Sequence, residues 1–302
     1  MEDRQVTVTF FHHSGFSVGC SDTLMIFDYW RGEKNEISGS LALTENDFKG
    51  YKQVLFFISH EHPDHYDRVV YDFKHLNYVH YIIASDMPMD AEGDRMAVGD
   101  KRRYGNAAVT AFGSTDLGVS YYVVINDVHI FHAGDLNLWH WREESTLRQI
   151  TQAENFFYEA VKPIAGLPID ICMFPVDPRM GGMYEAGANH FIMTCKPHVF
   201  IPMHWQGRTE IANDFARRCR TKYTEGLALT KPREHAVITF ENNSINIHVY
   251  LAAEQEDMLK RRQRTENEDV VRQALRSFED GDPFSDSDLP VDAFTADKKA
   301  QE

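Results

Sequence analysis

Cysteine is scarce in this chain of 302 residues, which has only four, and no two of them form a C-x-x-C pair. This wide spacing excludes a thiolate zinc motif and a disulfide framework, so we expect reduced thiols, mostly in the core. They are Cys20, Cys172, Cys195 and Cys219. Apolar runs long enough to cross a bilayer are also lacking, and no basic-then-apolar leader opens the sequence. We therefore expect a cytoplasmic protein with no membrane span.

Basic residues are fewer than acidic ones: the chain has 31 Lys and Arg and 46 Asp and Glu, which gives a formal net charge of −15. A protein whose main task is to grip a nucleic acid backbone needs a basic face, so this balance disfavours nucleic acid as a partner. The expected partner is a small-molecule substrate, and a homo-oligomer stays open. Histidine, in contrast, is plentiful, with 15 residues.

Short apolar runs typical of β-strands fill the chain up to residue 250 and are interspersed with helical patterns. Antiparallel runs are followed by strand–helix units, and this order occurs roughly twice. It predicts an α+β fold, a four-layer αββα sandwich with two sheets face to face and helices outside. We expect strands at 6–11, 15–19, 24–28, 54–58, 81–84, 107–112, 119–125, 129–132, 169–174, 199–203, 236–240 and 245–250, and helices at 66–76, 147–161, 184–194 and 209–220.

The composition changes near residue 250. We expect residues 1–250 to form one folded domain. Residues 251–278 are charged with sparse apolar positions and are expected to form a solvated helix. Residues 279–302 are acidic and contain Pro and Ser, which predicts a disordered tail.

The densest chemical signal comes directly after the apolar run at 54–58, where three His and one Asp fall within six residues: His60, His62, Asp64 and His65. Imidazole and carboxylate groups suit zinc and similar cations. In an irregular turn His60 and His62 can point one way while Asp64 and His65 point another. The spacing therefore predicts a centre of one or two zinc ions, with manganese or iron as alternatives.

This His-x-His-x-Asp-His motif resembles the signature of the metallo-β-lactamase-fold hydrolases, and the likeness covers about residues 5–250. The resemblance implies a metallo-β-lactamase-like hydrolase domain. Further pieces follow in that family's order. The Gly-Asp motif at 131–135 implies that Asp135 bridges both metals, and the segment 201–204 implies that His204 binds the second one. The implied ligand set is His60, His62, Asp64, His65, Asp135 and His204.

Two more residues receive roles from the resemblance. Asp28 ends an early strand, where the family has an acid that supports the metal-binding loop. The segment 12–16 is similar to the Gly-His-Ser segment of one branch, which holds ascorbate-6-phosphate lactonase-like and N-acyl-phosphatidylethanolamine phospholipase D-like enzymes. This likeness implies that His13 lies at the pocket rim and binds substrate.

The chain departs from that branch in one place. There, a strand before the Gly-Asp motif ends in Ala-x-His-Ser-Ser, and its His completes the first metal site. The corresponding segment here reads AFGSTD, with Gly113 at the place of the His. Three alternatives follow. His132, His140 or Asp116 replaces the histidine as a metal ligand, or the first metal binds weakly with extra water as a ligand, or the site has been repurposed.

Two segments near the predicted ligands are expected to face the substrate. Trp139 follows Asp135 closely and predicts a pocket wall, although packing at a helix start explains it equally well. Arg179 follows the expected strand at 169–174 and suits two-point binding of a carboxylate or phosphate. A simple turn between Asp177 and Arg179 is the alternative.

These residues predict a metallo-hydrolase that uses a metal-bound hydroxide on a small ester, lactone or phosphodiester. Asp64 would hold the hydroxide, as a ligand of the second metal or as general base, and Asp28 would support the loop. The alternative is a catalytically inactive metal-binding sensor or scaffold with a modified first metal site, which Gly113 motivates.

Overall fold

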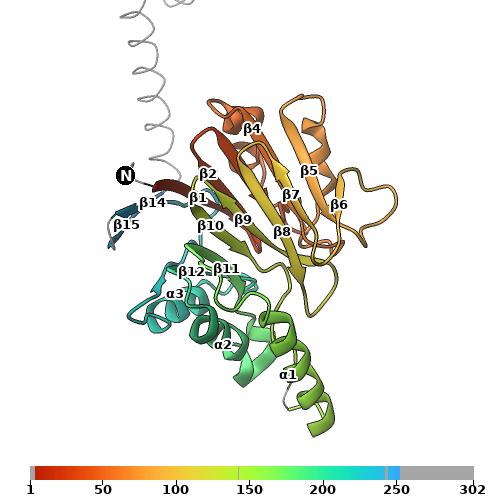
Figure 1. Ribbon diagram of the computed structural model, residues 1–302, viewed down its shortest axis with the longest axis vertical. Helices are drawn as coiled ribbons and strands as arrows, with labels where there is room; N and C mark the ends of the chain where they lie inside the picture. The colour runs from red at the N-terminus through yellow and green to blue at the C-terminus, as the bar shows by residue number, and fades with distance from the viewer. Residues whose placement is uncertain (1–3, 142, 242–243, 252–302) are drawn as a thin grey trace, which may run out of the picture. The chain divides into compact units, whose positions relative to one another are not determined.

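Residues 4–141, 143–241 and 244–251 are described by the structure, a computed structural model, and their strands form two sheets (Figure 1). All of these residues belong to one compact unit, Met1–Ala252. The charged helix expected at 251–278, beyond its first residue, and the tail expected at 279–302 lie outside the described residues.

The first sheet has eight strands in the order β15-β14-β1-β2-β3-β4-β5-β6. Its β1–β2–β3 and β14–β15 neighbours are antiparallel, whereas β3 to β6 run parallel. All but the first residue of β4 are buried, as expected for a continuous apolar run covered on both faces. The strands are β1 (Arg4–His12), β2 (Gly15–Cys20), β3 (Thr23–Phe27), β4 (Gln53–Ile58), β5 (Val79–Ala84), β6 (Asp94–Met96), β14 (His235–Glu241) and β15 (Ser244–Tyr250).

The second sheet has seven strands in the order β13-β12-β11-β10-β9-β8-β7. It repeats the plan of the first, because β7 to β10 are antiparallel and β10 to β13 run parallel. The strands are β7 (Lys101–Tyr104), β8 (Ala107–Gly113), β9 (Val119–Ile125), β10 (Val128–His132), β11 (Ile171–Pro175), β12 (Val199–Met203) and β13 (Glu225–Gly226).

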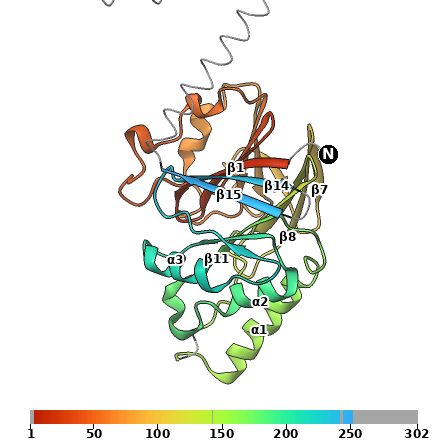
Figure 2. The ribbon, with the colours of Figure 1, turned by 90° about the vertical axis from the view of Figure 1, so that its left-hand side faces the viewer.

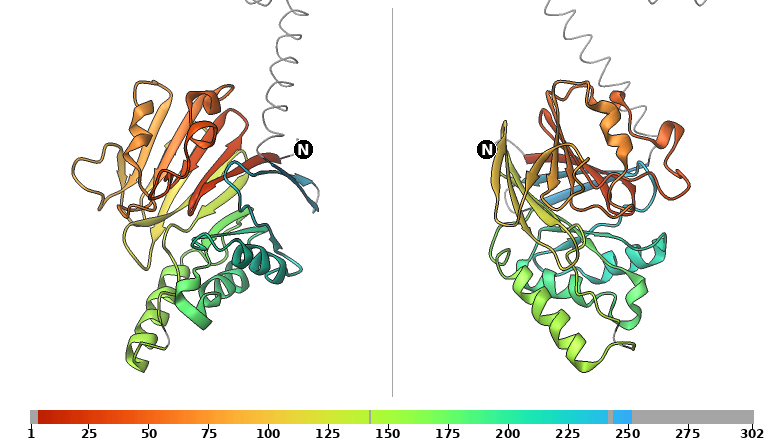
Figure 3. Two further views of the ribbon diagram at one scale, coloured as in Figure 1. Left: turned by 180° about the vertical axis from the view of Figure 1, so that it is seen from behind. Right: turned by 90° about the vertical axis from the view of Figure 1, so that its right-hand side faces the viewer.

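The two outer layers differ in kind. The helices α1 (Leu147–Val161), α2 (Ala186–Cys195) and α3 (Thr209–Arg218) contact strands of the second sheet, and Figures 1 and 2 show α2 and α3 beside β11 and β12, with α1 farther away. On the first sheet, the 3₁₀ turns η2 (Glu45–Phe48) and η3 (Arg68–Phe73, orange in Figure 3) place aromatic rings against β4 and β5. Among the described residues, no helix combines the length and apolar character needed to cross a membrane.

The α+β fold with four αββα layers is therefore confirmed, although the short strands β6, β7 and β13 were not predicted and one predicted helix differs. The helix expected at 66–76 is only the 3₁₀ turn η3. Asp67 starts this turn by accepting a hydrogen bond from Val69 N, and the β-branched pair Val69 and Val70 disfavours a longer α-helix.

Contacts between the sheets bring particular strand ends together. The ring of Phe57 in β4 stacks on Phe27 in β3 at 4.7 Å and meets Tyr121 of β9 at 5.2 Å. The Tyr121 hydroxyl donates to Ile58 O over 3.0 Å, and Phe27 stacks on His132 of β10 at 5.1 Å. The ends of β3, β4 and β10 are thus held at one edge of the sandwich.

Two glycines allow loops to approach the chain as it leaves β4. Gly118 has φ +70°, and a Cβ there would collide with Ser59 O, while a Cβ at Gly134 would lie 2.8 Å from Ser59 Cβ. Val119 N donates to Ser59 O over 3.1 Å, which fixes this approach. Only glycine fits at such positions, so these loops are packed directly on the segment that leads into the His60–His65 loop.

Gly118→Ala is expected to lower the free energy of unfolding by about 3 kcal/mol or more, because left-handed backbone and overpacking each cost ~1–3 kcal/mol. Gly99→Ala is the matched control, since Gly99 has φ +92° but nothing lies within 4 Å of an added Cβ. Its loss is expected to stay near ~1–2 kcal/mol. Urea unfolding measures both variants, and equal losses would contradict the packing role of Gly118.

Candidate metal centre

Loops that follow strands meet at this edge. The loop after β4 carries His60 to His65, the loop after β10 carries Asp135, and His204 directly follows β12. The turn between β1 and β2 adds His13. Imidazoles and carboxylates from segments far apart in the sequence therefore converge on one place.

Asp135 lies at the centre of this cluster, with only 6% of its side chain exposed. Its Oδ2 is 3.5 Å from His60 Nε2. Its Oδ1 is 3.0 Å from His65 Nε2 and 3.4 Å from His204 Nε2. The two oxygens thus face different imidazoles, an arrangement that suits a carboxylate shared by two cations.

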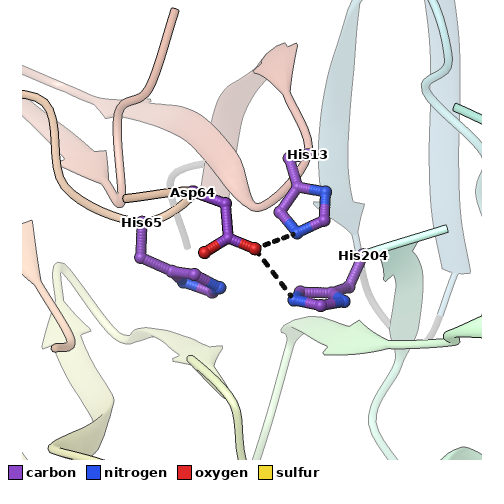
Figure 4. A group of neighbouring side chains, drawn as sticks. All are labelled: His13, Asp64, His65 and His204. Atoms are coloured by element: carbon purple, nitrogen blue, oxygen red, sulfur yellow. Dashed lines mark ion pairs between the residues drawn. The ribbon is translucent and has the colours of Figure 1, made fainter. Parts of the chain in front are cut away.

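We call His13, Asp64, His65 and His204 the inner group. Each offers a potential ligand atom, and these atoms all lie within 4.8 Å of one another. Figure 4 shows the four side chains pointing toward one another, with Asp64 Oδ2 3.2 Å from His13 Nε2 and 3.7 Å from His204 Nε2. The rings of His13 and His204 are 3.9 Å apart. The sequence predicted three of these residues as ligands and placed His13 only at the pocket rim.

We call His60, His62 and Asp116 the outer group. His60 Nε2 is 3.0 Å from His62 Nδ1, and Asp116 Oδ2 is 3.8 Å from the same nitrogen. Ligand atoms of His62, Asp116 and Asp135 all lie within 4.8 Å of one another. The outer group is more open than the inner one, because the side chains of His62 and Asp116 are 40% and 41% exposed.

Several buried atoms of the cluster make no hydrogen bond to any described residue, and they are His13 Nε2, His65 Nε2, His204 Nε2 and Asp135 Oδ1. Buried polar atoms almost always have a hydrogen-bond partner, so a convergent set without one is exceptional. Imidazole nitrogens and carboxylate oxygens are the donors that zinc, manganese and iron accept. The residues present therefore fit bound divalent cations.

Buried carboxylates fix the orientation of these imidazoles from behind. Asp28 Oδ2 is 2.8 Å from His65 Nδ1, and Asp28 also accepts hydrogen bonds from Ser59 N at 2.8 Å and Ser59 Oγ at 2.6 Å. Ser59 Oγ in turn lies 2.9 Å from His60 Nδ1. The Nδ1 atoms of both imidazoles are thus occupied, and their Nε2 atoms are directed at Asp135.

Asp177 does the same for His204, with Oδ2 2.7 Å from His204 Nδ1. This role of Asp177 was not predicted from the sequence. The available signal was position, because Asp28 follows β3, the neighbour of β4, and Asp177 follows β11, the neighbour of β12. In both sheets an acid from the adjacent strand end holds a histidine of the ligand-bearing strand.

Three residues of the cluster adopt the left-handed backbone conformation that is uncommon outside glycine. The φ angles are +54° at His13, +42° at Asp28 and +61° at His204. Such conformations are unfavourable for L-residues and concentrate at functional sites, where the surrounding structure holds them.

The electrostatics of the cluster favour positive charge between its carboxylates. Burial lowers the pKa of His13 to about 3, and His204 beside it acts in the same direction, so the imidazole is neutral. Burial raises the pKa of Asp135, but His65 and His204 outweigh this effect and hold it well below its usual range. Burial lowers the pKa of His65, but the carboxylates of Asp135 and Asp28 raise it by more than burial lowers it. The net pKa of His65 therefore lies well above its usual value.

The structure shows where the three residues considered as replacements for a histidine at Gly113 lie. His132 Nε2 lies 2.9 Å from Ser14 O inside the core, which is a structural role. His140 is buried but belongs to none of the groups of ligand atoms among the described residues. Asp116 does belong to one, together with His62.

The two expected substrate-facing residues lie beside the cluster. The Trp139 ring is 5.7 Å from that of His204, and its Nε1 donates to Asp135 O over 2.7 Å. Arg179 and Asp177 form the turn that was the alternative to substrate binding. Arg179 Nε and Nη2 donate to Asp177 at 2.9 and 2.6 Å. Its side chain is nevertheless 55% exposed, which leaves the outer edge of the guanidinium accessible.

No protein-family model matches this sequence, and no curated protein sequence matches it. Similarity is found among solved structures. Igni18, a metallo hydrolase from the archaeon Ignicoccus hospitalis, has a TM-score of 0.58 and 18% identity, covering 78% of this chain and 100% of its own. A protein of Parabacteroides distasonis described as a metal-dependent hydrolase has a TM-score of 0.54 and 15% identity, over 74% and 93%.

A third similar structure has a different chemistry. CmlA, a diiron β-hydroxylase from Streptomyces venezuelae, has a TM-score of 0.50 and 14% identity, covering 80% of this chain and 55% of its own. At such low identities the likeness concerns the fold and not the activity. The resemblance to the lactonase-like and phospholipase D-like branch stays a prediction. The αββα sandwich predicted from the sequence is the fold of this chain, and Igni18 and the Parabacteroides protein share it over most of the chain.

Proposed function

We propose that this protein is a metal-dependent hydrolase with two divalent cations, one on each side of Asp135. The proposal rests mainly on one observation: buried imidazole nitrogens without hydrogen bonds converge with an Asp135 oxygen. A purely structural polar cluster would satisfy these atoms internally. The ligands would be His60, His62, Asp64, His65, Asp135 and His204. Zinc is the ion we favour, with manganese or iron as alternatives.

Metal ions held there would lower the pKa of water toward neutrality and polarise a carbonyl or phosphoryl oxygen of the substrate. Burial raises the pKa of Asp64, but its contacts with His13 and other imidazoles bring the net pKa below its usual range. Its side chain is also 32% exposed. As a ligand of the inner cation, this ionised carboxylate would hold the attacking water; with a single bound cation it would instead accept the water's proton. His13 lies next to it, with Nε2 3.2 Å from Asp64 Oδ2, and we propose that it contacts the substrate.

The substrate we propose is a small ester, lactone or phosphodiester. A cavity of about 250 Å³ lies against Arg179, whose charge also acts on Asp64 and Asp135. This volume suits a small molecule rather than a polymer. The guanidinium offers binding to an anionic group, and we propose that Trp139, whose ring is 5.7 Å from that of His204, forms a wall of the substrate site. The cavity is lined by Trp141, Glu143, Glu144, Arg179, Met180, Gly181, Gly182 and Met183.

Removal of one ligand from each group tests the metal dependence. The double variant His62→Ala and Asp64→Asn is expected to lose bound metal and all hydrolysis above background. The assay is a panel of chromogenic phosphodiesters, lactones and esters with zinc or manganese, alongside metal analysis. Glu61→Gln is the matched control, because Glu61 is exposed and belongs to neither group. Undiminished turnover in the double variant would refute the mechanism, and bound metal without any turnover in the wild type would favour the sensor alternative.

Asp177→Asn tests the carboxylate behind His204. The charge that orients the imidazole is lost, so metal affinity is expected to fall by about 10–100-fold while the chain stays folded. Competition with a chelating dye measures the affinity. Asp170→Asn is the control, because Asp170 is also buried and lies 3.1 Å from a histidine nitrogen, that of His198, away from the cluster. Equal affinities in both variants would rule out a positioning role for Asp177.

Arg179→Ala tests the anion subsite. For substrates with a carboxylate or phosphate near the scissile bond, KM is expected to rise roughly tenfold or more, because a charge-assisted hydrogen bond is lost. Neutral esters are expected to change little. Steady-state kinetics on a matched charged and neutral pair measures the difference. An equal effect on both substrates would mean that Arg179 acts only through Asp177.

A further inference from the structure

We propose that Asp116 is a ligand of the outer metal ion and completes the site that lacks a histidine at Gly113. This inference rests on the proposed function, because it assigns one more residue to the same centre. The outer site would then consist of two imidazoles and two carboxylates, and Asp135 would be shared between the outer and inner sites.

Distance supports this assignment. Asp116 Oδ2 lies 3.8 Å from His62 Nδ1, and His62, Asp116 and Asp135 each offer a potential ligand atom within 4.8 Å of the other two. Two atoms that each bind one ion at about 2 Å are at most about 4 Å apart, and the 3.8 Å between His62 and Asp116 lies within this limit. Asp116 lies three residues beyond Gly113, on the loop between β8 and β9, so the same loop still delivers a donor.

The loop that carries Asp116 is anchored on both sides of it, which distinguishes Asp116 from an ordinary surface acid. Before it, Thr115 Oγ1 donates to Asn137 O at 2.5 Å and accepts from Asn137 N at 2.8 Å. After it, Gly118 N donates to Asp86 at 2.9 Å. The first pair ties the loop to the segment that follows Asp135. Asp116 is therefore held next to the cluster by bonds that do not involve its own carboxylate.

Gly113 leaves open space where the histidine would be. Apart from its two chain neighbours, no described residue has an atom within 4 Å of a Cβ built at Gly113, so no described side chain has moved into that place. His132 is bonded to Ser14 O, and His140 joins no group of ligand atoms in the described part of the chain. Of the three candidates, Asp116 is the one that lies within reach of His62.

This donor set makes the two sites unequal. The side chains of His65 and His204 in the inner group are 0% and 2% exposed, whereas those of His62 and Asp116 are 40% and 41% exposed. The ion at the outer site is therefore the more weakly held and the more exchangeable. A second carboxylate in place of an imidazole also shifts the outer site toward manganese and iron, which accept oxygen donors well.

Metal stoichiometry tests the assignment without reference to activity. The wild-type chain is loaded with zinc or manganese, dialysed, and measured by mass spectrometry of the metals and by competition with a chelating dye. It is expected to hold two ions, one released before the other. Asp116→Ala is expected to hold one, because affinity at the outer site falls by about tenfold or more while the inner affinity is unchanged. The nearly isosteric variant Asp116→Asn is expected to hold one ion, as Asp116→Ala does. The control variant Glu61→Gln is expected to hold two ions, as the wild type does.

The outcomes separate this inference from the function on which it rests. Two ions in the wild type and two in Asp116→Ala, with equal affinities, would overturn the role of Asp116 and leave the metal centre standing. A single wild-type ion that Asp116→Ala retains would also overturn it. A wild-type chain that binds no metal would overturn the proposed function together with this inference.

Discussion

The buried carboxylate of Asp28 is the group on which the rest of the centre depends. A charge without solvent is costly unless it is fully bonded, and here Ser59 N, Ser59 Oγ and His65 Nδ1 all lie within 2.8 Å of it. These bonds join the end of β3 to the loop after β4. Through Ser59 they reach His60 as well. One carboxylate in the core thus sets the directions of imidazoles in both the inner and the outer group.

The second sheet has the same arrangement at its strand ends. Asp177, which follows β11, is bonded to His204, which follows the neighbouring strand β12. The sandwich brings the two arrangements face to face, and Asp135 lies between them with one oxygen toward each set. The cluster is therefore a product of the packing of the two sheets. The left-handed conformations of His13, Asp28 and His204 are tolerated because this packing holds them in place.

Much of this arrangement could be predicted from the sequence, because the ligands stand in short motifs at the ends of apolar runs. The roles of Asp177 and Asp116 could not. Asp177 makes the local turn with Arg179 that its sequence suggests, and its bond to His204 exists only through tertiary packing. For Asp116, the sequence left His132 and His140 as alternatives, and only the folded chain brings Asp116 to 3.8 Å from His62 and His132 to 2.9 Å from Ser14 O. Edge strands such as β13, of two residues, carry no pattern to detect.

The central claim is that two divalent cations lie on either side of Asp135. Anomalous diffraction from crystals of the wild-type chain grown with zinc or manganese tests it most directly. Two peaks are expected, one beside His65 and His204 and one beside His62 and Asp116. No anomalous peak within ligand distance of Asp135, at metal concentrations that saturate the protein in solution, would contradict it.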